Sequence, residues 1–172
     1  MPLGAARFGL LGGVADLGKL ELIETQVADN SSSTLDFTSI EESTYNVHFL
    51  TVNNMSVASA GTNARNIFVR LSNNGGTSFI SSSTYQRAYQ QCNSNGVFNE
   101  IRSTGISYLN LTGAETNSST ILSSNCYIYF YNLGDSAKYS FSTVHSSGWN
   151  KNFFFSLFLV VQFIQLQKHI MQ

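Results

Sequence analysis

The sequence predicts an all-β domain, a β-sandwich of jelly-roll type built from about eight short antiparallel strands. Short apolar runs rich in β-branched and aromatic residues recur along the chain, and no stretch before residue 150 has the period of an amphipathic helix. Clusters of Gly, Asn and Ser separate these runs, and the single proline is Pro2, so the turns use residues that tolerate positive φ. With 172 residues, of which 42% are hydrophobic, the chain can bury one core.

Four short strands are expected in the first half of the chain. Residues 19–27 mix charged and apolar side chains, which favours an edge strand, with a short helix as the alternative. Residues 35–37 alternate between apolar and polar and are expected to form a second strand. In residues 45–52 both faces become apolar toward the end, so we expect this strand at the centre of a sheet. Residues 67–72 are β-branched and aromatic at their start and are predicted to form the fourth strand.

The strongest turn signal of the chain is Asn73-Asn74-Gly75-Gly76, directly after the fourth strand. This cluster separates two alternating segments, which is the pattern of a hairpin. We predict a hairpin turn with positive φ in at least one of the two glycines, after which residues 77–80 return as a strand.

The second half of the chain is expected to supply the remaining strands. Residues 85–90 place Tyr85 and Tyr89 on one face and precede a second turn signal, Asn-Gly at 95–96. Residues 126–131 are almost wholly apolar between turns and are predicted to form a buried strand. The other elements expected here are a strand at 107–111, a polar loop at 116–119 and a strand at 139–144.

The predicted core consists of residues that recur at strand period inside the most apolar runs. Such residues point to one face of a strand, and that face packs on the other sheet of a sandwich. The predicted core residues are Tyr45, Val47, Phe49, Val69, Leu71, Ile128, Phe130 and Phe141.

We divide the chain into an N-terminal arm at 1–18, the β-sandwich domain at 19–150 and an apolar C-terminal tail at 151–172. The apolar run of the tail is broken by serine and glutamine and is shorter than the ~20 residues that a membrane-spanning helix needs, so no membrane anchor is expected. The composition changes abruptly after Trp149, and a reverse translation of residues 158–172 read one base earlier gives a Gly-Gly turn in a β-rich phrase. We therefore hypothesise that the tail is a frameshift product that replaces the closing strands and leaves an open sheet edge.

Charge and cysteine content argue against several classes of protein. Lys plus Arg (9) nearly balances Asp plus Glu (10), and the charges are scattered, so nucleic acid is not an expected partner. The N-terminus lacks the clean apolar run and cleavage site of a secretory signal peptide. Cys92 and Cys126 have no metal-binding spacing, and we expect buried free thiols, with a disulfide between the two as the alternative.

No arrangement of residues in the sequence matches a catalytic or metal-binding template. His48, His145 and His169 are not spaced as metal ligands. Glu41 and Glu42 are adjacent carboxylates in a Ser- and Thr-rich stretch, which predicts a solvated turn rather than an acid–base pair. Nucleophile elbows, phosphate-binding loops and zinc-protease motifs are absent from the sequence. The sequence therefore predicts a protein that is not an enzyme and has no cofactor and no metal.

Aromatic residues are the candidates for contact with a glycan or a partner protein. Tyrosine and tryptophan can stack on sugar rings and are common where proteins meet. Most tyrosines on alternating strands are expected to point into the core, which leaves few at the surface. The residues proposed for glycan or partner contact are Tyr85, Tyr89, Tyr108 and Trp149.

Several phrases of the sequence resemble a known family: residues 35–38 leading to 45–49, then 69–79 with the glycine turn, and 128–133. They are similar to small β-rich proteins encoded in the structural modules of marine and other tailed bacteriophages, which are often described as tail-fibre-like. The resemblance runs over residues 18–149, and the chain lacks the family's closing Leu-Tyr-Gly-like phrase. It implies a place in the virion and carries no catalytic residues to transfer.

Resemblance and composition together predict a non-enzymatic structural module of the phage virion, in the tail, the tail fibre or the capsid exterior, that serves assembly or host attachment. The expected partners are other virion proteins and further copies of the chain, in a trimer if the protein is a fibre element. A carbohydrate-binding module that contacts a host-surface glycan is the alternative, and a tail-associated polysaccharide-degrading enzyme is the third possibility. The expected location is the virion, after synthesis in the host cytoplasm.

Overall fold

The computed structural model describes residues 20–29, 32–56, 67–111, 123–135, 137–149 and 155–164, and in the last of these ranges the side chains of Phe155 and Leu157 alone. The predicted N-terminal arm and the predicted loop at 116–119 lie outside the described residues. In the part of the chain that the structure describes, all regular elements are strands and every strand pair is antiparallel. The prediction of an all-β antiparallel fold is therefore confirmed.

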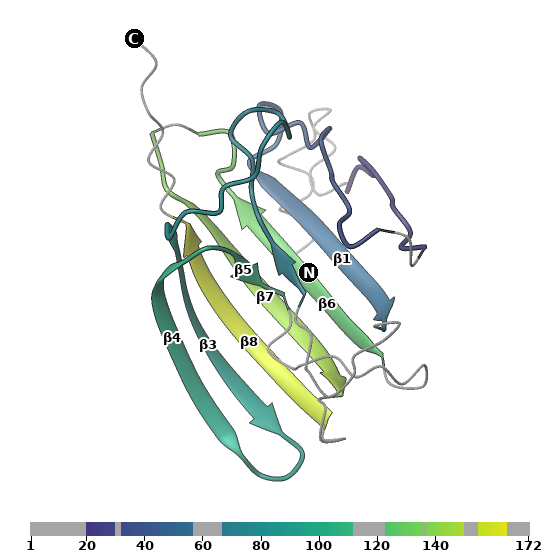
Figure 1. The fold of residues 1–172 in the computed structure, drawn as a ribbon, viewed down its shortest axis with the longest axis vertical. Helices are drawn as coiled ribbons and strands as arrows, with labels where there is room; N and C mark the ends of the chain where they lie inside the picture. Colours follow the sequence, from purple (N-terminus) through teal and green to yellow (C-terminus); the bar gives the residue numbers. More distant parts are fainter. Residues whose placement is uncertain are drawn as a thin grey trace, which may run out of the picture.

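Six of the strands form one sheet, and two short strands form a separate pair (Figure 1). The strands are β1 (Val47–Met55), β2 (Phe68–Val69), β3 (Tyr85–Asn93), β4 (Phe98–Ile106), β5 (Leu109–Asn110), β6 (Ser124–Tyr131), β7 (Ser140–Trp149) and β8 (Phe155–Ile164). The large sheet has the order β1-β6-β7-β8-β3-β4, and the pair is β2–β5.

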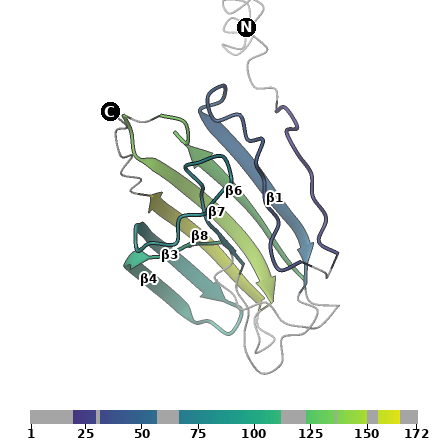
Figure 2. The same cartoon turned by 45° about the horizontal axis from the view of Figure 1, so that its top comes forward.

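The last strand lies inside the large sheet rather than at its edge (Figures 1 and 2). β8 pairs with β7 from Ser140 to Trp149 and with β3 from Tyr85 to Asn93. Its apolar residues, uninterrupted by glycine or proline, suit a strand with a neighbour on each side. The segment that we separated as a tail thus joins β1-β6-β7 to the β3–β4 hairpin. The open edges of the sheet are at β1 and β4 and not beside β8.

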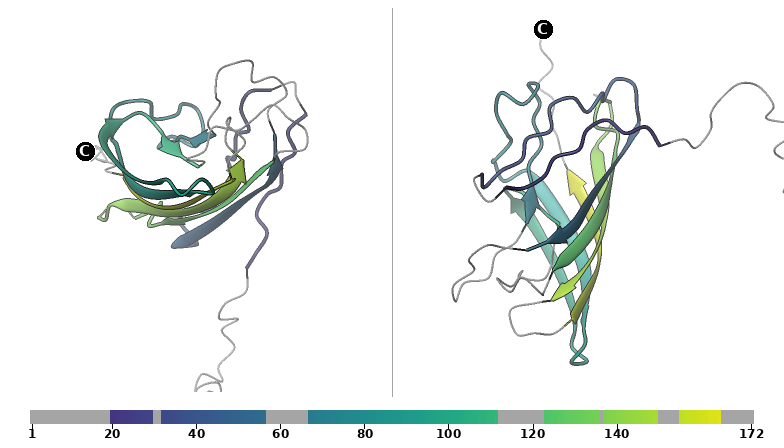
Figure 3. Two further views of the ribbon diagram at one scale, coloured as in Figure 1. Left: turned by 90° about the horizontal axis from the view of Figure 1, so that it is seen from below. Right: turned by 90° about the vertical axis from the view of Figure 1, so that its right-hand side faces the viewer.

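The large sheet is curved, and β2 and β5 lie over its concave side (Figure 3). Apolar side chains of the two layers meet between them, and Leu109 and Leu111 pack against the inward residues of the large sheet. Burial of each such side chain contributes about 1.5–3 kcal/mol to folding. The buried apolar residues are Tyr85, Tyr89, Leu109, Leu111, Cys126, Ile128, Phe130 and Val144.

Alternation on β6 separates a core face from a convex face. Cys126, Ile128 and Phe130 are buried, whereas Tyr127 and Tyr129 point to the other side of the sheet. The predicted core positions Ile128 and Phe130 are therefore confirmed. The strand predicted to be buried is buried on one face only.

The core face that the sequence predicts for β1 is wrong. His48 is buried, and Leu50 and Val52 pack against the core, whereas Val47 and Phe49 are exposed on the convex side. Apolar residues occur on both faces of this segment, so the period of two predicts alternation without deciding which face points inward. β1 is also an edge strand and not the central strand that we expected.

The other predicted core residues divide into two pairs. Val69 and Leu71 pack against the buried cluster, as predicted. Tyr45 and Phe141 are half-buried and do not belong to that cluster, which corrects their assignment. The hydroxyl of Tyr45 instead donates a hydrogen bond to Glu21 Oε2 at 2.5 Å.

Three predicted strands do not form in the described residues, namely those at 19–27, 35–37 and 77–80. In the first of these segments most side chains are exposed, and Gln26 Nε2 donates to the backbone oxygen of Asp36 at 2.7 Å in place of a strand ladder. A loosely alternating segment becomes a strand only where a partner strand pairs with it. Conversely, the sequence did not predict β4, because its charged and small polar residues weaken the apolar signal.

The turn predicted after the fourth expected strand, at residues 73–76, has the expected backbone conformation. Gly75 and Gly76 have φ values of +67° and +87°, which side chains other than that of glycine rarely allow. Ser72 Oγ accepts the N–H of Gly76 at 2.9 Å, and the N–H of Ile80 donates to the oxygen of Leu71 at 2.8 Å. The prediction of positive φ is confirmed, and the chain reverses here without a following strand.

Alanine at Gly76 should destabilise the fold more than alanine at Gly75. Each change costs about 1–2 kcal/mol for the left-handed conformation. A Cβ atom on Gly76 would also lie 2.7 Å from Thr38 Cγ2, whereas one on Gly75 meets open space. Urea denaturation measures both losses, and in a Thr38→Ser background the extra cost of Gly76→Ala should disappear. Equal losses in the two single variants would contradict the contact with Thr38.

Candidate functional site

The histidine and carboxylate side chains of the described residues do not form a catalytic or metal-binding cluster. His48 is buried on the inner face of β1 and has no hydrogen-bond partner at either ring nitrogen. His145 lies on the opposite face, stacked on a tyrosine ring. Glu41 and Glu42 are exposed beside a turn, and His169 lies outside the described part of the chain. No group of three His, Cys, Asp or Glu residues that could hold a metal ion occurs in the described ranges.

The four aromatic residues proposed for contact lie in different places. Tyr85 and Tyr89 are core residues, and the hydroxyl of Tyr85 bonds to two backbone groups of the loop before β3. Tyr108 is half-buried, with its ring centroid 4.9 Å from that of Phe68. Trp149 is exposed at the end of β7. The fold does not bring these four side chains together.

An aromatic layer covers the convex side of β1, β6 and β7, opposite the core. Its members are Phe49, Tyr127, Tyr129, Tyr131, Phe141 and His145. The centroid of Phe49 lies 4.6 Å from that of Tyr129, so the layer is continuous from β1 to β6. The alternate tyrosines of β6 are its signal in the sequence. That signal did not identify the layer, because an almost wholly apolar run fits a strand buried on both faces equally well.

The paired rings of the aromatic layer stand upright on the sheet. Tyr131 and Phe141 are ladder partners, with centroids 4.5 Å apart and planes 14° apart. Tyr127 and His145 are also ladder partners, at 4.8 Å and 9°. These separations are close to the ~4.8 Å spacing of neighbouring strands. The ring faces therefore turn toward one another, and the ring edges turn toward solvent.

The strands that carry the aromatic layer have no charged side chains. β1, β6 and β7 contain no Asp, Glu, Lys or Arg. Phe49 and Tyr127 nevertheless remain 38% and 39% exposed. An exposed aromatic surface depleted in charge is typical of the centre of a protein–protein contact.

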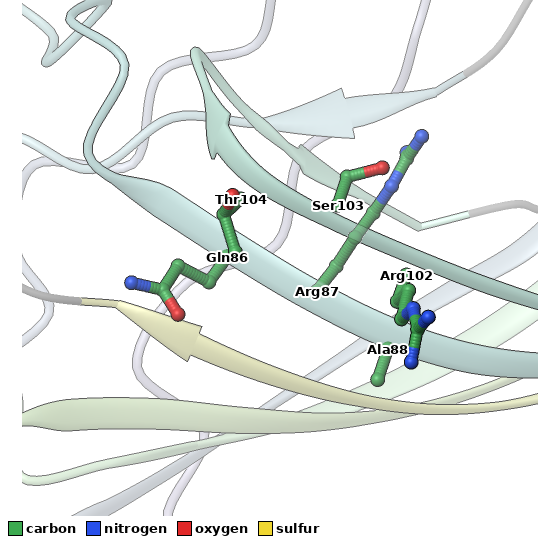
Figure 4. Close-up of a pocket in the computed structure, with 6 residues that line it drawn as sticks. All are labelled: Gln86, Arg87, Ala88, Arg102, Ser103 and Thr104. Carbon is green, nitrogen blue, oxygen red and sulfur yellow. The ribbon is translucent and has the colours of Figure 1, made fainter.

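A hollow of about 410 Å³ lies against β3 and β4 (Figure 4). It is lined by Gln86, Arg87, Ala88, Arg102, Ser103 and Thr104. Arg87 and Ser103 are ladder partners and point to one side of the sheet, whereas Ala88 and Arg102 are ladder partners that point to the other. The six side chains thus do not converge on one point, and Arg87 and Ser103 are the polar pair on the concave side.

Arg87 lies on the core face of β3, between the inward side chains of Tyr85 and Tyr89. Its guanidinium carbon is 5.4 Å from the centroid of the Tyr89 ring, and its Nε and Nη1 atoms are buried without a hydrogen-bond acceptor. Burial raises the pKa of the Tyr89 phenol, and the positive charge of Arg87 opposes this rise. Arg87 is not among the residues predicted for a site, although its spacing of two residues from each inward tyrosine places it on the same face.

The two cysteines are free and lie on opposite faces of the large sheet. Cys126 is buried, and burial raises the pKa of its thiol to about 11. Cys92 is exposed on the convex side of β3. The prediction of free thiols is confirmed for both, and the prediction of burial holds for Cys126 but not for Cys92.

Among the described residues, none belongs to a helix that is long and apolar enough to cross a membrane. Comparison of the chain with protein-family models, with curated proteins and with solved structures finds no match.

Proposed function

We propose that this protein is a non-enzymatic structural module of a bacteriophage particle, in the tail, the tail fibre or the capsid exterior, that acts through contact with neighbouring proteins. The observation that carries the proposal is the aromatic layer, an exposed surface on strands without charged residues. The phrases that resemble tailed-phage structural proteins supply the context of a particle.

Contact with protein fits the aromatic layer better than stacking on sugars. A sugar ring stacks on a free aromatic face, but the faces of the Tyr131–Phe141 and Tyr127–His145 pairs cover each other. These two pairs therefore present ring edges and the hydroxyls of their tyrosines. Ring edges pack against apolar side chains of a partner, and tyrosine hydroxyls find hydrogen-bond acceptors at its rim.

We further propose that the two layers belong to a jelly-roll sandwich in which β2–β5 is part of the second sheet. Two features support this assignment. First, β2 and β5 cover the concave side of the large sheet (Figure 3). Second, the paired strands β1 and β6, and likewise β3 and β8, are not consecutive in the sequence, so other strands intervene along the chain, as in folds that wind between two sheets. An experimental structure with only two strands in the second layer would contradict it.

The neighbouring genes test the assignment to a particle. We expect tail or capsid genes on both sides of this gene. A position among metabolic genes, with no phage structural gene nearby, would contradict the proposal. Release of reducing sugar from a host polysaccharide by the purified protein would overturn its non-enzymatic part.

Self-association should accompany this function, because an exposed face without charge favours contact between copies. Light scattering at high micromolar concentration should give a mass above the 18.9 kDa of one chain. Tyr127→Glu places a charge in the aromatic layer and should shift the protein toward monomer, whereas Ser81→Glu in an exposed loop should not. A clean monomer of the wild-type protein at this concentration would count against the proposal.

Carbohydrate binding is the second candidate function, and the hollow beside Arg87 is the observation that favours it. This hollow is separate from the aromatic layer, so the two functions can coexist in one protein. A glycan array on the purified chain tests it. A protein that enters particles but binds no glycan would exclude this second function and leave the first.

A further inference from the structure

The strand β4 is an open edge of the large sheet, with backbone groups that point away from its neighbour β3. The N–H of Asn93 donates to the oxygen of Val97 at 2.9 Å, so hydrogen bonds to β3 recur at every second residue from Val97 onward. The backbone groups of Phe98, Glu100 and Arg102 lie between these positions and therefore face the open side. No described segment pairs with β4 on that side, and none lies beyond it in Figures 1 and 2.

The exposed side chains of β4 include two opposite charges that are two residues apart. Alternation along the strand places four side chains on the convex side, those of Phe98, Glu100, Arg102 and Thr104. Phe98 is 61% exposed. Among the described residues, no carboxylate forms an ion pair with Arg102, and no basic side chain forms one with Glu100. The edge therefore presents hydrogen-bonding groups, an aromatic ring and one charge of each sign to a partner.

A second β4 strand complements this edge when the two strands run antiparallel about a two-fold axis at Ile101. Glu100 of each copy then lies opposite Arg102 of the other, and these two positions form the hydrogen-bonded pairs of the new ladder. Phe98 lies opposite Thr104, and the two Ile101 residues face each other. Opposite charges and aromatic–β-branched pairs are favourable across antiparallel strands.

The charges select both the register and the partner. An axis at Glu100 would place two glutamates opposite each other, and an axis at Arg102 would do the same with two arginines; both arrangements are unfavourable. Charged residues on an edge usually hinder pairing with other chains. Here their opposite signs and two-residue spacing instead match a second copy of the same strand. The other open edge, β1, has no charged residue, so no register is selected there.

We propose that β4 pairs antiparallel with β4 of a second copy, through backbone hydrogen bonds and two reciprocal Glu100–Arg102 ion pairs, and joins two large sheets into one. Each copy uses the same strand, so the contact closes at two chains. The strands β8 and β3 separate β4 from the strands of the aromatic layer. The pairing is therefore a contact distinct from that layer, and it does not depend on the function proposed for it.

Disulfide cross-linking tests the register of the pair. The two Ile101 residues would form a non-hydrogen-bonded pair with Cα atoms about 4.5 Å apart, within the range of a disulfide. Ile101→Cys should therefore give a covalent dimer on a non-reducing gel after treatment with oxidised glutathione. The background is Cys92→Ser, because Cys92 is an exposed free thiol. Asn99→Cys is the matched control and should give no dimer, because it lies opposite Ser103 of the second copy. Absence of the Ile101→Cys dimer, or equal yields for the two variants, would overturn the register.

Charge reversal tests the ion pairs in the same cross-linking assay. Glu100→Arg and Arg102→Glu each turn both ion pairs into like-charge pairs and should slow cross-linking of Ile101→Cys at least about 10-fold. The double variant, and an equimolar mixture of the two single variants, restore opposite signs across the contact and should recover the rate. Unchanged rates in the single variants, or no recovery in the double variant and the mixture, would overturn the ion pairs.

Hydrogen exchange of the wild-type protein tests the contact without any substitution in β4. Amides of β4 should exchange more slowly as the protein concentration rises, whereas those of the exposed segment 20–29 should not change. A protein that self-associates while exchange in β4 stays constant would overturn the edge pairing and leave the proposed function standing. Slower exchange in β4 of a protein encoded far from phage genes would have the reverse meaning.

Discussion

Replacing Phe130 with alanine should lower the free energy of unfolding by about 3–5 kcal/mol, the range for a buried phenylalanine. The same change at Phe49 should lower it by only about 0.5–1.5 kcal/mol, the contribution of its exposed ring contacts. Phe130 is 6% exposed and belongs to the core cluster, whereas Phe49 lies on the convex side, 4.6 Å from the Tyr129 ring. The two residues occupy the paired strands β6 and β1, so the comparison isolates burial.

Urea denaturation followed by circular dichroism measures both losses, provided that the dependence on urea concentration is unchanged. Ile128→Val removes one buried methylene group and serves as the conservative control, with an expected loss of about 0.5–1.5 kcal/mol. A loss below about 1 kcal/mol at Phe130, or equal losses at Phe130 and Phe49, would reject the assignment of the core face.

The same pair of residues shows which parts of the fold the sequence could predict. Alternation is local, so the strands around Phe49 and Phe130 were placed correctly along the chain. The choice of the inward face depends on which layer covers the sheet, and that is a nonlocal property. The turn at Gly75 and Gly76 was predictable because positive φ is a requirement of the glycines themselves.

The position of β8 could not be predicted from local pattern. Its apolar residues differ in composition from the Ser-rich strands before it, which led us to separate it from the domain. Strand order depends on pairing between distant segments, and β8 pairs with β3, which lies about 70 residues earlier in the chain. β4 was missed for the opposite reason, because an edge strand tolerates the polar and charged residues that hide its period.

The aromatic layer and Arg87 likewise could be predicted from the sequence only in part. The tyrosines of β6 lie in the apolar run that predicts a strand. Their place in an exposed layer depends on the strands beside them, which the run does not identify. Arg87 was not predicted as a site residue, because a single arginine in a strand is usually solvated. Its place on the core face follows from the register, in which it is the ladder partner of Ser103.

Proline in place of Val160 should destabilise the protein by at least about 3 kcal/mol, because proline has no N–H group and cannot join a ladder in the interior of a sheet. Val160 is opposite Val144 on β7 and Tyr89 on β3, near the middle of β8. The β3–β4 hairpin is joined to β1-β6-β7 within the sheet through β8. Disruption of this strand should therefore expose backbone amides on both of its neighbours.

Hydrogen exchange measured by mass spectrometry tests this expectation directly, since amides of β3 and β7 should exchange faster in Val160→Pro than in the wild-type protein. Val27→Pro is the matched control, because Val27 is 83% exposed and belongs to no strand, so its effect should stay within about 0.5 kcal/mol. Faster exchange in β7 with unchanged exchange in β3 would place β8 at a sheet edge. Unchanged exchange in both strands would show that β8 is not part of the sheet.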